Sequence, residues 1–101
     1  MKLDWLEAGV NLYEPGETME CLIIILDGEV TLKTVMDDEI PVVLERLGRG
    51  CILGANTFLV SDQTEVTATC TMPTRIFAIE RSRFTQIVQR DKKLFKELLK
   101  I

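Results

Sequence analysis

The sequence predicts a mainly β domain, built as a sandwich or a barrel, that is followed by a helical segment. Strand-like apolar runs recur at a spacing of about ten residues in the first 80 positions, and turn residues separate them. From residue 81 onward, apolar residues recur three and four positions apart, as on one face of a helix. We therefore expect a single domain over residues 1–101, with a β part at 1–80 and a helical part at 81–101.

Residues 1–20 read as an irregular lead-in that contains one short strand. Val10 and Leu12 alternate with polar neighbours in this strand. Pro15-Gly16 follows and is a turn signal.

The next elements predict a hairpin. Residues 21–26 form a continuous apolar run of strand length, which is typical of a strand buried on both faces. Asp27-Gly28 comes directly after it, and residues 29–34 then alternate apolar and polar side chains. Because Asp-Gly between two strand-like runs is a strong hairpin signal, we expect these two strands to pair with each other.

Three more strands are expected in the rest of the β part. Residues 40–48 form one strand candidate, and residues 65–70 and 75–80 form two others with a short turn between them.

The helical part has an amphipathic pattern. Ser82 is its expected N-cap, and Asp91 interrupts the apolar stripe, so the segment is either two short helices or one bent helix. The pattern is still running at Ile101, which predicts that the chain is a fragment of a larger protein. The stripe comprises Phe84, Ile87, Val88, Phe95, Leu98 and Leu99.

Charge is distributed unevenly along the chain. Residues 1–80 carry five Lys or Arg against fourteen Asp or Glu, a net of −9, whereas residues 81–101 carry seven against two, a net of +5. An acidic body argues against nucleic acid as a partner, since binding there depends on neutralising phosphates. The basic segment is interpreted as a solvated helix face, with contact to an acidic partner or an anionic membrane surface as the alternative. The longest aliphatic run, residues 22–26, is too short to cross a bilayer, so no membrane insertion is expected.

The chain contains no histidine, and this limits the chemistry that it can perform. Neither a Ser-His-Asp triad nor a His-ligated metal site can be built, so a cupin-like metalloenzyme is disfavoured and no enzyme or metal site is expected. Cys21, Cys51 and Cys70 are odd in number and widely spaced. We interpret them as reduced, mostly buried thiols of a cytoplasmic domain.

The segment from Gly48 to Cys70 has the outline of a loop that holds a phosphate. It has glycines, a short helix-like turn and a polar stretch that runs into a strand. However, Asp62 and Glu65 are its only charged side chains after Arg49. The cation that an anion-binding loop normally carries is missing.

Three stretches together resemble cyclic nucleotide-binding domains. They are "LEAGVNLYEPGETMECLIIILDGEVTLKT", "LERLGRGCILG" and "TATCTMPTRIFAIERSRFTQIV". The resemblance runs from about Leu6 to Leu99. It implies an eight-stranded jelly roll, also called a double-stranded β-helix, with a short cassette helix, one or more C-terminal helices and a pocket for cAMP or cGMP.

The resemblance also implies which residues form the phosphate-binding cassette. In the family pattern F-G-E-x-A-L-L, followed by P-R-x-A-T-V-x-A, the Glu holds the ribose and the Arg pairs with the cyclic phosphate. Aligned without gaps, Ala55 stands at the Glu and Thr64 at the Arg, so both ligand-binding side chains are missing. The candidate ligand-binding residues are Leu53, Gly54, Ala55, Asn56, Thr64 and Thr67.

Four residues carry simpler structural expectations. Trp5 and Tyr13 are expected to pack in the core or at its rim rather than to stack on a base. Phe58 is expected to hold the loop helix against the roll, and Gly54 to supply a tight backbone conformation.

Two functions remain open from the sequence. The first is a cytoplasmic regulatory domain of an ion channel, with cyclic nucleotide binding weak or lost, which contacts other domains of its parent and oligomerises through the parent. The second is a working cAMP or cGMP sensor of a channel, exchanger or kinase regulatory subunit. Its divergent pocket would use Asn56, Thr64 and Thr67, together with an arginine from outside the loop.

Overall fold

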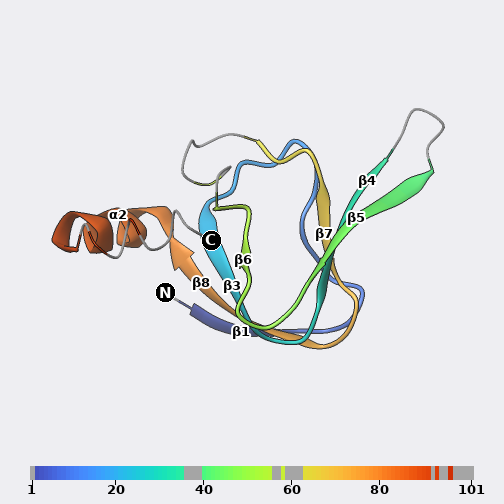
Figure 1. The fold of residues 1–101 in the computed structure, drawn as a ribbon, viewed down its shortest axis with the longest axis horizontal. Coiled ribbons are helices and arrows are strands. Elements are labelled where there is room, and N and C mark those ends of the chain that lie inside the picture. The colour runs from blue at the N-terminus through green and yellow to red at the C-terminus, as the bar shows by residue number, and fades with distance from the viewer. Residues whose placement is uncertain are drawn as a thin grey trace.

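Two four-stranded antiparallel sheets face each other in the computed structural model of this protein (Figure 1). The strand orders are β1-β8-β3-β6 in the first sheet and β2-β7-β4-β5 in the second. This arrangement confirms the predicted jelly roll. The structure describes residues 2–35, 40–55, 58, 63–91, 93 and 96. The elements are β1 (Lys2–Leu6), β2 (Asn11–Tyr13), β3 (Cys21–Asp27), β4 (Val30–Val35), β5 (Pro41–Leu47), β6 (Ile52–Leu53), β7 (Thr67–Cys70), β8 (Thr74–Glu80) and α2 (Arg81–Arg90).

The core lies between the inner faces of the two sheets. The first sheet contributes Ile25 and Ile76, and the second contributes Val30, Ala68 and Cys70, all of them buried. β3 is the most apolar strand of the chain and lies between β8 and β6. The sequence had predicted a strand of this kind, since a central strand with side chains packed on both faces needs an uninterrupted apolar run.

The hairpin expected at Asp27-Gly28 is wrong. β3 belongs to the first sheet and β4 to the second, so the turn carries the chain from one sheet to the other. β3 already pairs with β8 and β6 and therefore has no free edge for β4. Gly28 has φ +104° and passes close to β8: a Cβ built on it would lie 2.7 Å from both the Pro73 carbonyl oxygen and the Thr74 Cα. Glycine is needed here for the crossing between the sheets rather than for a two-residue hairpin.

β1 was not predicted, because its apolar side chains Leu3 and Trp5 face outward and its charged ones face inward, the reverse of the usual pattern in a strand. Leu3 and Trp5 are 63% and 54% exposed on the outer face, while Lys2 and Asp4 lie on the face that looks between the sheets. The strand exists through its pairing with β8 along all five of its residues. Trp5 is therefore not a core residue, whereas Tyr13 is buried as expected.

The remaining strands agree with the sequence, apart from the two-residue β6, which was not predicted. The predictions at 40–48, 65–70 and 75–80 correspond to β5, β7 and β8. β4 and β5 form the only pair of consecutive strands that are hydrogen-bonded to each other among the described residues. Their hairpin projects from the roll in Figure 1.

α2 starts two residues earlier than predicted. Its N-cap is Glu80, with extended φ and ψ of −65° and 151°, and Ser82 lies inside the first turn. The structure supplies a backbone partner in place of a side-chain cap, since the Arg81 N–H donates to the Glu20 carbonyl oxygen at 3.1 Å. The predicted interruption at Asp91 is confirmed, because the backbone there leaves the helical region with φ −140°.

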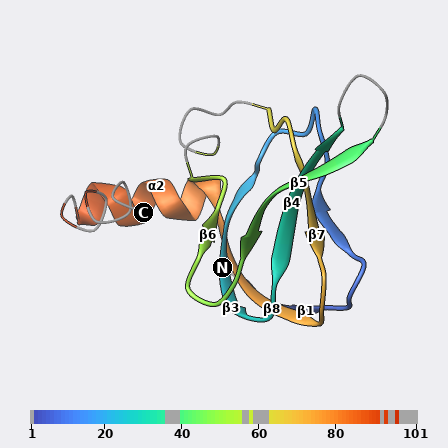
Figure 2. The same ribbon diagram turned by 45° about the vertical axis from the view of Figure 1, so that its right-hand side comes forward.

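α2 packs on the roll through Phe84 and Val88. Phe84 is buried, and the helix contacts β3 and β8 before it extends away from the sheets (Figure 2). Of the predicted stripe, Phe95, Leu98 and Leu99 lie outside the described residues. Within the described part of the chain, no helix has the length and apolar character needed to cross a membrane.

Candidate functional site

The cassette begins with a helical turn directly after β6. Gly54 has φ +61°, and its carbonyl oxygen accepts a hydrogen bond from the Phe58 N–H at 2.9 Å. Ala55 and Phe58 both have helical backbone geometry. The positive φ explains why glycine stands at this position, as the sequence predicted.

The space beside Gly54 is filled by side chains of the roll. A Cβ on Gly54 would overlap the Met19 Sδ and would lie 3.8 Å from the Tyr13 hydroxyl oxygen. Burial of Tyr13 raises the pKa of its phenol above the usual value, so this hydroxyl stays neutral at physiological pH. The two side chains that pack beside Gly54, Met19 and Tyr13, are therefore both uncharged.

Thr64, which the ungapped alignment predicts at the position of the family's arginine, is hydrogen-bonded to the turn at residues 14–17. Its side chain is buried, and its hydroxyl donates to the Glu14 carbonyl oxygen at 2.8 Å. Its N–H donates to the Glu17 carbonyl oxygen, and its own carbonyl oxygen accepts from the Gly16 N–H, both at 2.9 Å. The hydroxyl proton of Thr64 is thus already used within the protein.

The structure brings some of the predicted site residues together and separates others. Leu53, Gly54 and Ala55 follow one another from the buried end of β6 into the cassette turn. Thr64 lies in the returning arm of the loop, close to the turn before β3. Thr67 pairs with Lys33 on the outer face of the second sheet, because the buried Ala68 takes the inward position beside it. The site prediction for Asn56 falls outside the described residues.

Three arginines that lie outside the loop, Arg46, Arg49 and Arg75, could replace the missing cation only by pointing into the roll, and none of them does. Arg75 lies between the buried Thr74 and Ile76 of β8, so its side chain faces outward. Arg46 is paired with Thr31 on the outer face of the second sheet. Arg49 is exposed in the turn that follows β5.

A cation does contact the cassette, but it binds backbone carbonyls. The Arg81 guanidinium donates to the Phe58 carbonyl oxygen at 2.5 Å and to the Met19 carbonyl oxygen at 2.7 Å. Its Cζ lies 4.2 Å from the centroid of the Phe58 ring, a cation–π distance. Sequence reasoning missed this residue, because nothing local distinguishes Arg81 from Arg83, and one partner is 62 residues away.

The same cluster contains an aromatic pair that joins the cassette to α2. The Phe58 and Phe84 rings meet edge to face, with centroids 5.2 Å apart and an interplanar angle of 82°. Phe58 is fully buried, which agrees with the predicted role of holding the loop against the roll. Cassette and helix therefore share one packed contact.

We expect Phe58→Leu and Phe84→Leu to be coupled in their effects on stability. A double-mutant cycle in urea should give an interaction free energy of about 0.5–1.5 kcal/mol, the usual value of an edge-to-face pair beyond area burial. As a matched comparison, Phe84→Leu should show additivity with Val35→Ala, which lies on β4, away from the cluster. Additive effects of the two phenylalanine substitutions would contradict a direct contact.

Burial shifts the pKa of two cysteine thiols upward. Burial raises the pKa of the Cys21 thiol, and the charges of Glu80 and Glu20 raise it further. Burial also raises the pKa of Cys70, an effect partly offset by its hydrogen bond with Thr74. All three cysteines are unpaired. Among the described residues, no three His, Cys, Asp or Glu side chains cluster closely enough to hold a metal ion.

Comparison with known families defines the class of protein. A jelly roll with a loop helix between β6 and β7 and a helix after β8 is the arrangement that the resemblance to cyclic nucleotide-binding domains implied. The family model "Cyclic nucleotide-binding domain" matches residues 3–91. This chain therefore belongs to the cyclic nucleotide-binding domain family. No curated protein sequence matches the chain at a significant level.

Solved structures show the same fold. A transcriptional regulator from Thermotoga maritima superposes with a TM-score of 0.89 at 16% identity over 98% of this chain and 78% of that one. The catabolite activator protein of Thermus thermophilus gives a TM-score of 0.87 at 19% identity over 97% of this chain but only 46% of that one. A cyclic nucleotide-binding-like protein from Brucella abortus has a TM-score of 0.74 at 30% identity over 87% of this chain and 75% of that one.

Proposed function

We propose that this chain is a regulatory domain of the cyclic nucleotide-binding family in which binding of cyclic nucleotide is weak or lost. The observation that supports this proposal best is the hydrogen bond made by the Thr64 hydroxyl. This residue stands where the family pattern places the phosphate-binding arginine, and its hydroxyl is donated to the Glu14 carbonyl oxygen.

A cyclic nucleotide carries one negative charge on its phosphate, and this charge must leave water when the ligand binds. Removing this charge from water is costly unless a cation pairs with it. Backbone N–H groups at the start of a helical turn contribute only about 0.3–2 kcal/mol, far less than a bidentate guanidinium contact. The nearest well-placed cation, Arg81, is bound to two carbonyl oxygens.

In this proposal the domain acts through contacts rather than through ligand sensing. The Arg81 and Phe84 contacts with Phe58 connect the cassette to α2. We propose that α2 and the surfaces beside it contact other domains of a larger cytoplasmic protein, which oligomerises through its own interfaces. The domain itself is not an enzyme in this proposal.

The nature of the larger protein is a separate question. The Thermotoga structure is described as a transcriptional regulator, and none of the three structures named above is described as a channel. The expected channel parent therefore gains no support from them. A working cAMP or cGMP sensor remains the second candidate, because the family scaffold is kept, including the tight turn at Gly54.

Titration calorimetry with cAMP and cGMP tests this proposal. The wild-type domain should give no saturable binding at low micromolar ligand, whereas Ala55→Glu combined with Thr64→Arg should create or strengthen cAMP binding. The added guanidinium and carboxylate restore the two side chains of the family pattern. Losing the Thr64–Glu14 hydrogen bond should cost about 1 kcal/mol of stability, so folding of the variant is checked by circular dichroism.

A charge-free pair of substitutions is the matched control. Ala55→Gln with Thr64→Met adds similar volume without ions and should leave binding unchanged from the wild type. Saturable low-micromolar binding by the wild-type domain would overturn the proposal and establish the sensor. A folded charged variant without any binding would mean that the pocket is blocked or that the alignment register is wrong.

A further inference from the structure

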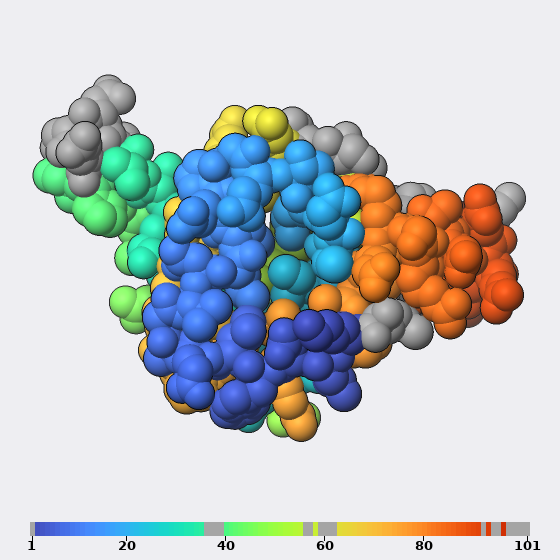
Figure 3. Space-filling view, turned by 180° about the vertical axis from the view of Figure 1, so that it is seen from behind, coloured from blue at the N-terminus to red at the C-terminus, as the bar shows by residue number. Residues whose placement is uncertain are grey.

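A hollow of about 470 Å³ opens between β1 and β2, which lie at corresponding edges of the two sheets. Figure 3 shows it between the blue residues of β1 and β2 and the lighter blue segment that leads into β3. The described cassette residues Leu53, Gly54, Ala55 and Thr64 do not line it. Its volume is in the range of small-molecule sites, about 300–1,000 Å³.

The inner wall of the hollow is made of core side chains. Ile23 and Ile76 reach it from the first sheet, Leu12 from β2, and Met19 from the segment between β2 and β3. These residues belong to the packed interior, yet at this edge of the roll they border an open space. An apolar body that entered the hollow would remove this surface from water, which is favourable.

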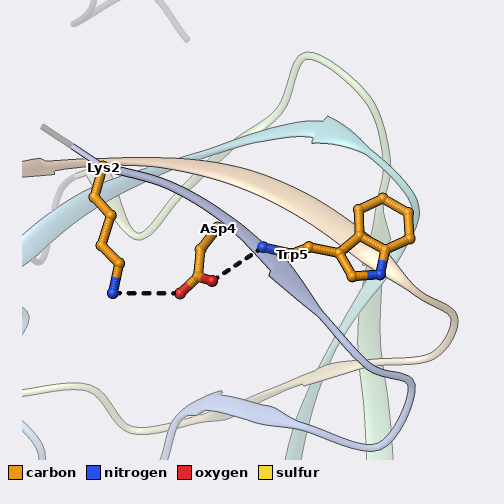
Figure 4. Close-up of polar contacts among 3 residues, drawn as sticks. All are labelled: Lys2, Asp4 and Trp5. Carbon is orange, nitrogen blue, oxygen red and sulfur yellow. Dashed lines mark hydrogen bonds and ion pairs between the residues drawn. The ribbon is translucent and has the colours of Figure 1, made fainter.

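The rim of the hollow is acidic. Lys2 and Asp4 point to the same side of β1 and form an ion pair at 3.6 Å, while Trp5 points away (Figure 4). Glu17 and Glu20 lie on the other side of the opening and are exposed to solvent. The ammonium of Lys2 is paired with Asp4, and Glu17 and Glu20 form no ion pair within the described part of the chain. The described rim residues therefore carry a net negative charge, with Asp4, Glu17 and Glu20 against Lys2.

We propose that this hollow binds a small amphipathic amine. The apolar part of the ligand lies between the sheets against Ile23 and Ile76, and its ammonium group sits at the rim near Glu17 and Glu20. The site is independent of the cassette, so it does not depend on whether a cyclic nucleotide binds there. An apolar wall with a few charged groups at the mouth is the usual composition of a ligand site.

Three probes of equal chain length test the chemical class. Octylamine, octanol and octanoate are titrated below their micelle concentrations into the full chain and followed by calorimetry. Octylamine should bind tightest, by about fivefold over octanol, since exposed carboxylates contribute little more than this. The advantage should shrink in high salt. Octanoate binding as tightly as octylamine, or no binding of any probe, would overturn the proposal.

The natural cysteines report where the probe binds. Cys21 lines the hollow, Cys51 does not, and both thiols are partly exposed. Octylamine should slow alkylation of Cys21, measured by mass spectrometry, and leave the rate at Cys51 unchanged. Equal effects on both cysteines, or no effect on Cys21, would place the probe elsewhere and refute the site.

Removing the charges at the rim distinguishes the contribution of the acidic rim from that of the apolar wall. Glu17→Gln with Glu20→Gln should bring octylamine affinity to within about twofold of octanol affinity and leave octanol binding as it was. Glu7→Gln with Glu65→Gln removes the same number of exposed charges from residues that do not line the hollow and should preserve the preference. A preference for the amine that survives the first pair would disprove the role assigned to the rim.

Discussion

Gly28→Ala is expected to lower the free energy of unfolding by about 4 kcal/mol, a large part of the roughly 5–15 kcal/mol that stabilises a native protein. Two effects add. The backbone at Gly28 has φ +104°, where an L side chain is strained, and the new Cβ would approach the Pro73 carbonyl oxygen and the Thr74 Cα at 2.7 Å. Both of these are backbone atoms of the segment entering β8, so neither can move aside like the end of a flexible side chain. The measurement is urea denaturation followed by circular dichroism.

Gly16→Ala is the matched control for this prediction. Gly16 has a similar φ of +90°, but nothing lies within 4 Å of a Cβ built on it. The control should therefore cost only the conformational term, about 1–2 kcal/mol. If both substitutions destabilise the protein equally, the close approach between the sheets is not what requires glycine at position 28.

Arg81→Met is the second substitution with a large expected effect. It removes two charge-assisted hydrogen bonds, to the carbonyl oxygens of Phe58 and Met19, and the stacking over the Phe58 ring. We expect a loss of about 2–4 kcal/mol, since one hydrogen bond to a charged group contributes about 1.5–3 kcal/mol and the site is partly exposed to solvent. Arg81→Lys should recover only part of this, because an ammonium cannot span both carbonyls with a planar fork.

The location of this effect can be measured as well as its size. Amide hydrogen exchange at Phe58 should accelerate in Arg81→Met, because the turn closed by the bond from Phe58 to Gly54 loses its anchor. Arg83→Met is the control: Arg83 is exposed, and its guanidinium donates to the side-chain oxygen of Gln86 in the same helix. Unchanged exchange at Phe58 would mean that Arg81 does not hold the cassette turn.

The sequence predicted the fold class because apolar runs and turns reveal strands even when their partners are unknown. It could not reveal the partners. The Asp27-Gly28 signal reports only a tight turn, and the choice between a hairpin and a crossing was made by β8 and β6, which occupy both edges of β3. β1 escaped prediction because Leu3 and Trp5 face outward, and only pairing with β8 explains the strand.

The candidate site could be predicted only in part, for a related reason. The alignment placed Ala55 and Thr64 at the ligand-binding positions, but the hydrogen bond that engages Thr64 comes from a turn 50 residues earlier. Arg81 was overlooked because its partners are carbonyl oxygens, and any residue type carries a carbonyl. Side-chain patterns cannot indicate an interaction of this kind.

The crossing at Gly28 also affects how the chain reaches its native state. Because β3 and β4 lie in different sheets, β4 and β5 are the only two consecutive strands of the described chain that pair with each other. Only this pair can form as a local hairpin. β1 can form only when β8 is available to pair with it, because Lys2 of β1 pairs with Ala78 of β8, far along the sequence. Folds whose strand pairs are mostly far apart in the sequence take about milliseconds to seconds to form. The apolar run of β3 therefore stays exposed to solvent, and open to aggregation, for most of the folding time.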